Sequence, residues 1–169
     1  GLISSRLTVE GPVKKDRASF VVSGRRTYAD IFLPLSSNKA LQNNKLYFYD
    51  LNAKINYRIN DNNQIFLSGY FGRDVFKNNF AGMNWGNETA TFRWNHLFNK
   101  KLFLNLSLVY SNYRYNLGTP TGNNNSFDWY SGLRDIGIKG DFSHYLNTNN
   151  TLKYGASLTY HMFDPGKAT

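Results

Sequence analysis

The chain contains no cysteine, which excludes both a disulfide framework and a metal site built from thiolates. It also lacks any run of 18 apolar residues, so no segment can cross a membrane as a single helix. Membrane strands remain open, because their apolar and polar residues alternate and cancel in a hydropathy average. Proline occurs only 4 times, a count that a soluble β-sandwich could share.

The sequence also lacks the motifs of catalysis. There is no Ser-His-Asp order, no glycine-rich phosphate loop and no HExxH. His96, His144 and His161 are not at ligand spacing from one another, and the carboxylates form no convincing pair. We therefore expect no enzymatic activity, no cofactor and no metal site.

The charge is positive but dispersed. There are 20 Lys and Arg residues against 11 Asp and Glu residues, giving a formal net charge of +9. The densest basic clusters are the pairs Lys14-Lys15, Arg25-Arg26 and Lys100-Lys101, and no helical basic stripe joins them. Together with the absence of a recognised binding motif, this argues against nucleic acid as a partner.

The chain is rich in aromatic residues and asparagine, and in many segments its apolar residues recur at every second position. In 102–111, Leu104, Leu106, Leu108 and Tyr110 share one side of an expected strand, and polar residues such as Asn105 fall largely on the other. Similar alternation is expected near 3–10, 19–24, 47–59, 64–74, 90–95, 136–143 and 152–162. This predicts an all-β chain of about eight strands of roughly ten residues, the length of a tilted membrane strand.

The expected connections alternate in length. Tight turns are predicted at 11–17, 60–63, 99–101 and 147–150, and long links at about 27–44, 73–87 and 116–127. A bacterial outer-membrane barrel has short periplasmic turns and longer extracellular loops, which produces this alternation. Aromatic residues also gather near the expected strand ends, as they do at membrane interfaces. Both features favour a transmembrane antiparallel β-barrel over a soluble sandwich.

Three stretches resemble the barrel of TonB-dependent outer-membrane receptors: SSRLTVEGPV at 4–13, SFVVSGRRTY at 19–28 and LSGYFGRDVF at 67–76. They are most similar to the type common in Bacteroidota, which is related to the SusC-like transporters. The resemblance implies a 22-strand barrel in the outer membrane, closed around an amino-terminal plug domain. Residues 1–169 would then be a partial barrel domain, without the plug and the remaining strands.

The partners that this resemblance implies are outer-membrane lipid, the plug and remaining barrel of the same protein, TonB through the plug, and a SusD-like surface lipoprotein. The implied function is TonB-dependent uptake of a solute. The expected solute contacts lie in extracellular loops, and they are Tyr28, Arg73, Asp74, Trp85, Tyr113, Arg114 and Tyr115. Two alternatives stay open: a receptor-like barrel that serves as a scaffold in an outer-membrane assembly, and a small self-closed barrel of eight strands.

Overall fold

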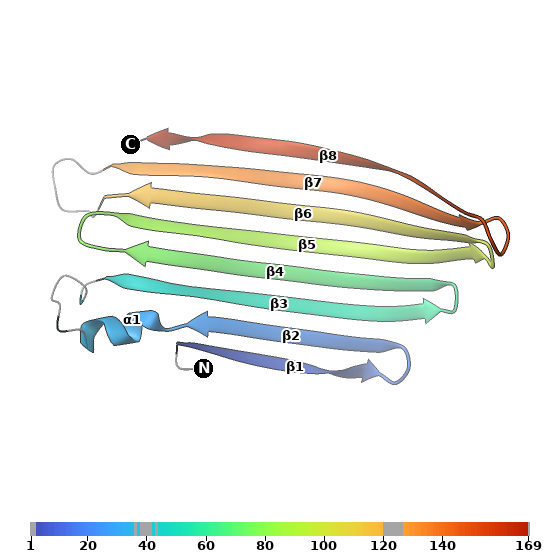
Figure 1. Cartoon of the computed structure of the whole chain (residues 1–169), viewed down its shortest axis with the longest axis horizontal. Helices are drawn as coiled ribbons and strands as arrows, with labels where there is room; N and C mark the ends of the chain where they lie inside the picture. Colours follow the sequence, from blue (N-terminus) through green and yellow to red (C-terminus); the bar gives the residue numbers. More distant parts are fainter. Residues whose placement is uncertain (1–2, 36, 38–41, 43, 120–126, 169) are drawn as a thin grey trace.

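The chain forms one antiparallel sheet in which each strand pairs with the next along the sequence (Figure 1). The computed structural model describes residues 3–35, 37, 42, 44–119 and 127–168. Within them the strands are β1 (Ser4–Lys14), β2 (Ala18–Thr27), β3 (Lys45–Asn60), β4 (Asn63–Lys77), β5 (Gly82–Asn99), β6 (Leu102–Gly118), β7 (Asp128–Tyr145) and β8 (Thr151–Ala168). A short helix, α1 (Ala29–Phe32), and a 3-10 turn, η1 (Leu33–Leu35), follow β2.

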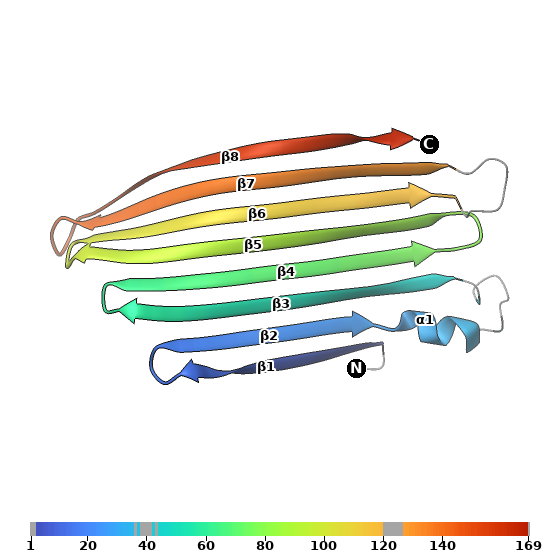
Figure 2. The ribbon, with the colours of Figure 1, turned by 180° about the vertical axis from the view of Figure 1, so that it is seen from behind.

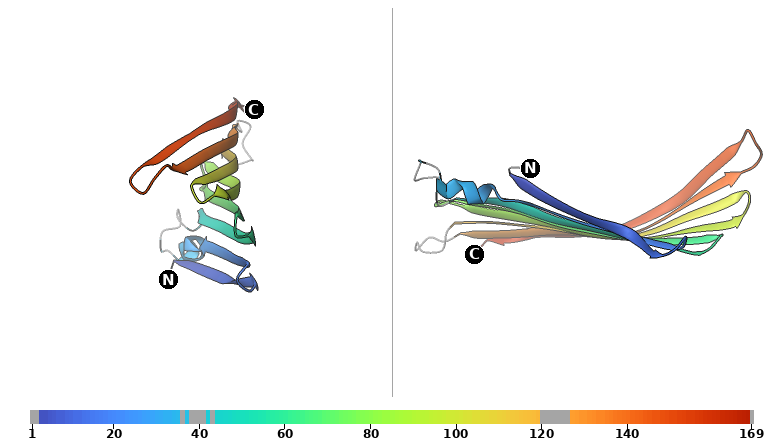
Figure 3. Two further views of the ribbon diagram at one scale, coloured as in Figure 1. Left: turned by 90° about the vertical axis from the view of Figure 1, so that its right-hand side faces the viewer. Right: turned by 90° about the horizontal axis from the view of Figure 1, so that it is seen from below.

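The sheet is a single twisted layer. Seen from behind and along its edges, no second sheet covers either face of the described residues (Figures 2 and 3). β1 pairs only with β2, and β8 pairs only with β7, so the sheet is open at both edges. The prediction of an all-β chain with eight antiparallel strands is confirmed, and the sheet is not closed into a barrel by these strands alone.

The register places the predicted apolar residues side by side. One row across the sheet runs through Ile55, Leu67, Phe92, Leu108, Ile138 and Leu158. We call this side of the sheet the Leu108 face. The opposite side, the Lys139 face, carries a row through Asn56, Phe66, Arg93, Ser107, Lys139 and Ser157. The two faces predicted from the alternation are therefore confirmed.

A single layer cannot enclose a hydrophobic core, and the described residues include no buried apolar side chain. On the Leu108 face of β8, Leu158 is 73% exposed and Tyr160 is 66% exposed. Exposed apolar surface of this extent marks a face that another apolar medium or molecule covers in the assembled protein.

The strands from β3 to β8 are longer than the ten residues predicted, whereas β1 and β2 have 11 and 10 residues. β5, β7 and β8 have 18 residues each, and β4 has 15. The predicted long link at 73–87 is wrong, because β4 continues to Lys77 and β5 starts at Gly82, which leaves only 78–81 between them. The predicted alternation of short and long links therefore fails at 78–81. This link was predicted to be long, but it is no longer than the link at 146–150, where a tight turn was predicted. The link at 28–44 is long, whereas 120–126 of the link after β6 lies outside the described residues.

Asparagine side chains build the turns. Asn60, Asn78, Asn99 and Asn147 each accept hydrogen bonds on Oδ1 from backbone N–H groups two or three residues ahead. In the turn after β5, Asn99 Oδ1 lies 2.8 Å from the nitrogen of Lys101 and 3.1 Å from that of Leu102. An Asx bond of this kind replaces a missing ladder bond where the chain reverses. The many asparagines therefore fix where strands end.

If the Leu108 face contacts hydrocarbon, Leu106→Arg should destabilise the protein by roughly 2–4 kcal/mol, because it puts a charge at mid-bilayer. Asn105→Arg is the matched control, since Asn105 lies on the Lys139 face between Asn95 and Asp141. We expect a much smaller loss there. The measurement is a urea titration of each variant refolded into liposomes, and equal losses would contradict the assignment of the faces.

Candidate functional site

The polarity of both faces reverses along the strands, as β6 illustrates. On the Leu108 face, Leu104, Leu106, Leu108 and Tyr110 are followed by Asn112, Arg114 and Asn116. On the Lys139 face, Asn105, Ser107 and Ser111 are followed by Tyr113, Tyr115 and Leu117. The change falls just beyond Tyr110, toward the end of the sheet that carries the link at 28–44. We call this end the long-link end and the other the hairpin end.

The reversal holds across neighbouring strands. Beyond the Tyr110 row, the Leu108 face has Glu88, Asn112 and Arg134 in one row, which is flanked by Phe71 on β4 and Met162 on β8. The next row has Arg73, Gly86 and Arg114. The Lys139 face has Trp85 in register with Tyr115, and then Met83 in register with Leu117 and Trp129. The apolar band of the Leu108 face spans nine residues of β6, from Leu102 to Tyr110. At about 3.3 Å per residue this is about 26 Å along the strand.

An aromatic cluster lines the Lys139 face at the long-link end. The rings of Tyr113 and Tyr115 are 6.5 Å apart. The indole Nε1 of Trp129 donates a hydrogen bond of 3.2 Å to the hydroxyl of Tyr115. Trp85 is the cross-strand neighbour of Tyr115, so these aromatic residues gather on one face of β5, β6 and β7.

A charged cluster lies beside these rings on the same face. Arg25 Nε donates to Asp50 Oδ2 at 2.8 Å, and its guanidinium lies 4.9 Å from the centre of the Phe48 ring. Asp74 is the cross-strand neighbour of Phe48. Partial burial of the Asp74 carboxyl and the negative charge of Asp50 both raise the pKa of Asp74, while the positive charge of Arg25 acts in the opposite direction. Asp74 is beyond the apolar band, in the part of β4 where the faces have exchanged polarity.

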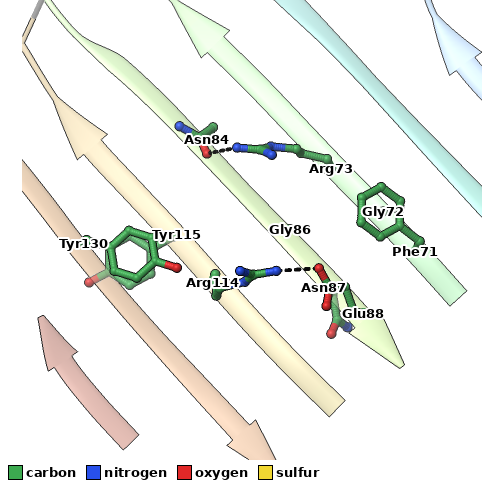
Figure 4. Close-up of a pocket in the computed structure, with 10 residues that line it drawn as sticks. All are labelled: Phe71, Gly72, Arg73, Asn84, Gly86, Asn87, Glu88, Arg114, Tyr115 and Tyr130. Carbon is green, nitrogen blue, oxygen red and sulfur yellow. Dashed lines mark hydrogen bonds and ion pairs between the residues drawn. The ribbon is translucent and has the colours of Figure 1, made fainter. Parts of the chain in front are cut away.

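A polar groove of about 240 Å³ lies on the Leu108 face at the long-link end, over β4 to β7 (Figure 4). Arg73 Nη2 donates to Asn84 Oδ1 at 2.9 Å, and Arg114 forms an ion pair with Glu88. Hydrogen bonds with Tyr130 and Glu88 keep the pKa of Arg114 above its usual value, so the guanidinium stays charged. Gly86 lies between Arg73 and Arg114 in the register and leaves the floor of the groove open.

The expected location of the solute contacts in loops is wrong for six of the seven residues. Asp74, Trp85, Tyr113 and Tyr115 lie in strands on the Lys139 face, whereas Arg73 and Arg114 lie in strands on the Leu108 face. Only Tyr28 is outside a strand, at the start of α1, and its hydroxyl is 3.0 Å from Ser5 Oγ. The strands continue through these positions because the backbone ladder is unbroken to Lys77 and Gly82.

The sequence prediction missed other residues at this end, namely Arg25, Phe48, Asp50, Asn84, Glu88, Trp129 and Tyr130. A signal for them does exist. The alternation of polar and apolar residues continues from Asn112 to Leu117, but with the two faces exchanged. An interpretation that expects one face to stay apolar along the whole strand takes this exchange of faces for the end of the strand.

No metal site accompanies these clusters in the parts of the chain that the structure describes, since no three His, Cys, Asp or Glu residues lie close enough to share an ion. Two such residues do lie in contact as a pair: His161 Nδ1 is 2.7 Å from Asp135 Oδ1. Among the described residues no helix is long and apolar enough to span a membrane.

No family model matches this sequence, and no curated protein is significantly similar to it. Solved structures are similar in fold. The ferric preacinetobactin receptor BauA from Acinetobacter baumannii superposes on 94% of the chain with a TM-score of 0.68 and 9% sequence identity. The ferric yersiniabactin uptake receptor FyuA from Yersinia pestis superposes on 95% of it with a TM-score of 0.50 and 12% identity.

The fold is that of a TonB-dependent receptor barrel. The similarity extends over only 28% of the BauA chain and 34% of the FyuA chain, so the present chain spans about a third of the length of these two proteins. Both similar proteins are named as receptors for a ferric ligand. At this level of identity the likeness concerns the fold of the barrel wall.

Asp74→Asn should stabilise the folded protein at neutral pH. Because the pKa of Asp74 is raised in the folded state, the folded protein binds more protons than the unfolded chain, and ionisation of Asp74 opposes folding. The gain should disappear below about pH 4, where the carboxyl is protonated in both states. Urea unfolding in liposomes at pH 7 and pH 3.5 measures this.

Asp50→Asn is the control for this test, because it removes the acceptor of Arg25 and should lower stability at pH 7. A destabilising effect of Asp74→Asn at pH 7, or the same gain at both pH values, would contradict the role given to its carboxyl.

Proposed function

We propose that this chain forms part of the wall of an outer-membrane receptor barrel that takes up a solute by a TonB-dependent mechanism. The observation that carries the proposal is the reversal of polarity beyond Tyr110. A wall that crosses lipid must be apolar outside and can be polar inside. Above the membrane the outer side meets water and headgroups, and the inner side can bind solute.

In this proposal the Leu108 face is the lipid side and the Lys139 face is the lumen side. The apolar band runs about 26 Å along β6. With a strand tilt of about 35–45° this corresponds to roughly 20 Å of height, which approaches the ~25 Å band of outer-membrane barrels. A chain of rings crosses the Leu108 face near the hairpin end, with His96 and Phe98 4.4 Å apart and Phe142 and Tyr154 5.2 Å apart. Such rings form the girdle expected at a membrane interface. The turns at 15–17, 61–62 and 100–101 are short and lie at the hairpin end, whereas the link at 28–44 lies at the other end, so we place the hairpin end in the periplasm.

The barrel is larger than these eight strands. The free edges of β1 and β8 carry backbone groups that need partners within lipid. The lumen face also carries charges such as Arg93, Lys139 and Asp135, which a wide, wet lumen accommodates better than the narrow interior of an eight-strand barrel. We therefore assign residues 1–169 to a partial barrel domain whose remaining strands and plug belong to the same protein.

The proposed solute site is the aromatic cluster of Trp85, Tyr113 and Tyr115 with the adjacent carboxyl of Asp74. Rings offer flat surfaces for a ligand with apolar or aromatic parts, and the Tyr hydroxyls and Asp74 can orient its polar groups. BauA and FyuA are receptors for ferric ligands, which makes iron complexes one class to test. The three stretches that resemble SusC-like receptors make oligosaccharides another, with a SusD-like lipoprotein as the partner.

The test uses a strain that lacks the receptor gene, grown on a panel of ferric complexes and oligosaccharides as the limiting nutrient. The wild-type gene should restore growth on one of them, and only when TonB is present. The double variant Trp85→Ala, Tyr115→Ala should reduce uptake of that solute about tenfold, because each ring contributes on the order of 0.5–1.5 kcal/mol. Tyr47→Ala, on the opposite face, is the matched control.

If the wild-type gene restores growth on no member of the panel and its loss removes other proteins from the outer membrane, the chain is a scaffold and the import proposal is wrong. If Tyr47→Ala impairs uptake as much as the double variant, the aromatic cluster is not the solute site.

The orientation has its own test, because the chain has no native cysteine. Phe80, in the link between β4 and β5, is 83% exposed. Phe80→Cys should react with a membrane-impermeant maleimide on intact cells. Asn62→Cys, in the turn at the hairpin end, should react only after lysis. Labelling of intact cells at position 62 and not at position 80 would reverse the topology.

A further inference from the structure

Three arginines gather on the Leu108 face directly beyond its apolar band. Arg73 and Arg114 belong to one row of the register, separated only by Gly86. Arg134 follows in the adjacent row, beside Asn112 on the neighbouring strand. The spacing between strands is about 4.8 Å, so the Cα atoms of Arg73 and Arg114 lie roughly 10 Å apart. The three side chains therefore frame one patch, which we call the arginine patch.

The charge of the arginine patch is only partly compensated. Glu88 pairs with Arg114 and also accepts a hydrogen bond of 3.3 Å from Asn112 Nδ2. Arg73 donates to the neutral amide of Asn84. Arg134 forms no ion pair within the described residues, and Asp164 on the edge strand is the carboxylate that lines the same groove as Arg134. The arginines thus outnumber the carboxylates, and the guanidiniums of Arg73 and Arg134 are open to an anion.

The space between these arginines is open. A Cβ at position 86 would lie 2.9 Å from the carbonyl oxygen of Gly72 and 3.8 Å from Cγ of Arg73, so a side chain there would fill the groove. The hydroxyl of Tyr130 and the amide of Asn84 add uncharged polar groups to its lining. The groove therefore suits a compact anion that is attached to a group with hydroxyls (Figure 4).

Directly next to the arginine patch, the same face offers an apolar groove. It is lined by residues of five strands, among them Leu67, Phe92, Leu108, Ile136 and Leu158. The row of Tyr110 and Ile136 is only two residues from the row of Asn112 and Arg134, which is about 7 Å along the strand. A ligand can therefore place an anion among the arginines and hydrocarbon chains on this groove at the same time.

We propose that the arginine patch binds the phosphorylated headgroup of a glycolipid in the outer leaflet, with the acyl chains of the lipid lying on the apolar groove. Guanidinium groups bind phosphate through paired N–H donors, and proximity to lipid strengthens the attraction. A free phosphate would use the arginines alone, whereas an amphiphile uses both parts of the surface. The inference rests on the proposed outward orientation of the Leu108 face.

The experiment uses the full-length receptor, purified in a non-ionic detergent and titrated with three probes. These are diphosphorylated lipid A, the same lipid after removal of its phosphates, and inorganic phosphate. Native mass spectrometry measures the bound fraction. The wild-type protein should prefer the phosphorylated lipid about tenfold over the dephosphorylated one, and millimolar inorganic phosphate should not displace it.

The double variant Arg73→Gln, Arg134→Gln removes the two open guanidiniums and keeps the Arg114–Glu88 pair, so it should lose this preference. A salt concentration of 0.5 M should weaken the preference in the wild-type protein. The matched control is Arg93→Gln, Lys139→Gln, which removes two positive charges from the Lys139 face. It should retain the preference. A shift of electrophoretic migration on heating, as folded barrels show, verifies that each variant is folded. The comparison of the two lipids on the wild-type protein does not depend on any variant.

The proposal is overturned by equal binding of the two lipids to the wild-type receptor, by equal losses in both double variants, or by displacement with inorganic phosphate. The last outcome would make the patch a site for free phosphate. Failure of the lipid-binding proposal can be distinguished from failure of the proposed function. A receptor that transports its solute but shows no phosphate preference refutes the lipid site alone, and lipid binding without uptake refutes only import.

Discussion

The register of the antiparallel ladder is the constraint on which the rest of this structure depends. Side chains alternate across a strand, so a slip of one residue would move Leu106, Leu108 and Tyr110 to the polar side. The register shifts lie near the ends of the strands, as at Leu97–Asn99 and Arg58–Asn60. The long central part of the sheet is therefore in one phase from β2 to β8, which keeps the two faces chemically distinct.

Because the register does not shift in the central part of the sheet, the reversal of polarity can be followed along each face. Because the ladder between β5 and β6 runs without interruption from Gly82 to Leu97, the exchange near Tyr110 comes from the sequence and not from a bulge. Along β6, the Leu108 face thus changes from apolar to polar, while the Lys139 face changes from polar to apolar. The aromatic cluster and the arginine patch arise at the same height from this one exchange, on opposite faces.

A one-layer sheet must obtain its burial from outside itself. The described residues have no buried apolar side chain, and the polar face offsets part of its charge through local pairs such as Arg25 with Asp50 and Lys139 with Asp141. Both pairs are partly exposed, so they contribute little stability by themselves. In the proposed function, lipid on the Leu108 face and further protein on the Lys139 face supply the missing burial.

The strand type, the order of the hairpins, and the two faces in the central part of each strand follow from the sequence alone, because a period of two is a local property. The turns at 60–63, 99–101 and 147–150 also follow from it, since asparagines such as Asn99 bond to their own backbone, but the turn at 78–81 was missed. The extent of the strands, and the face that each site residue occupies, required the three-dimensional structure. Arg114 and Tyr115 are adjacent in sequence yet lie on opposite faces, and their partners Glu88 and Trp129 come from other strands. Such pairings depend on cross-strand register, which no local pattern contains.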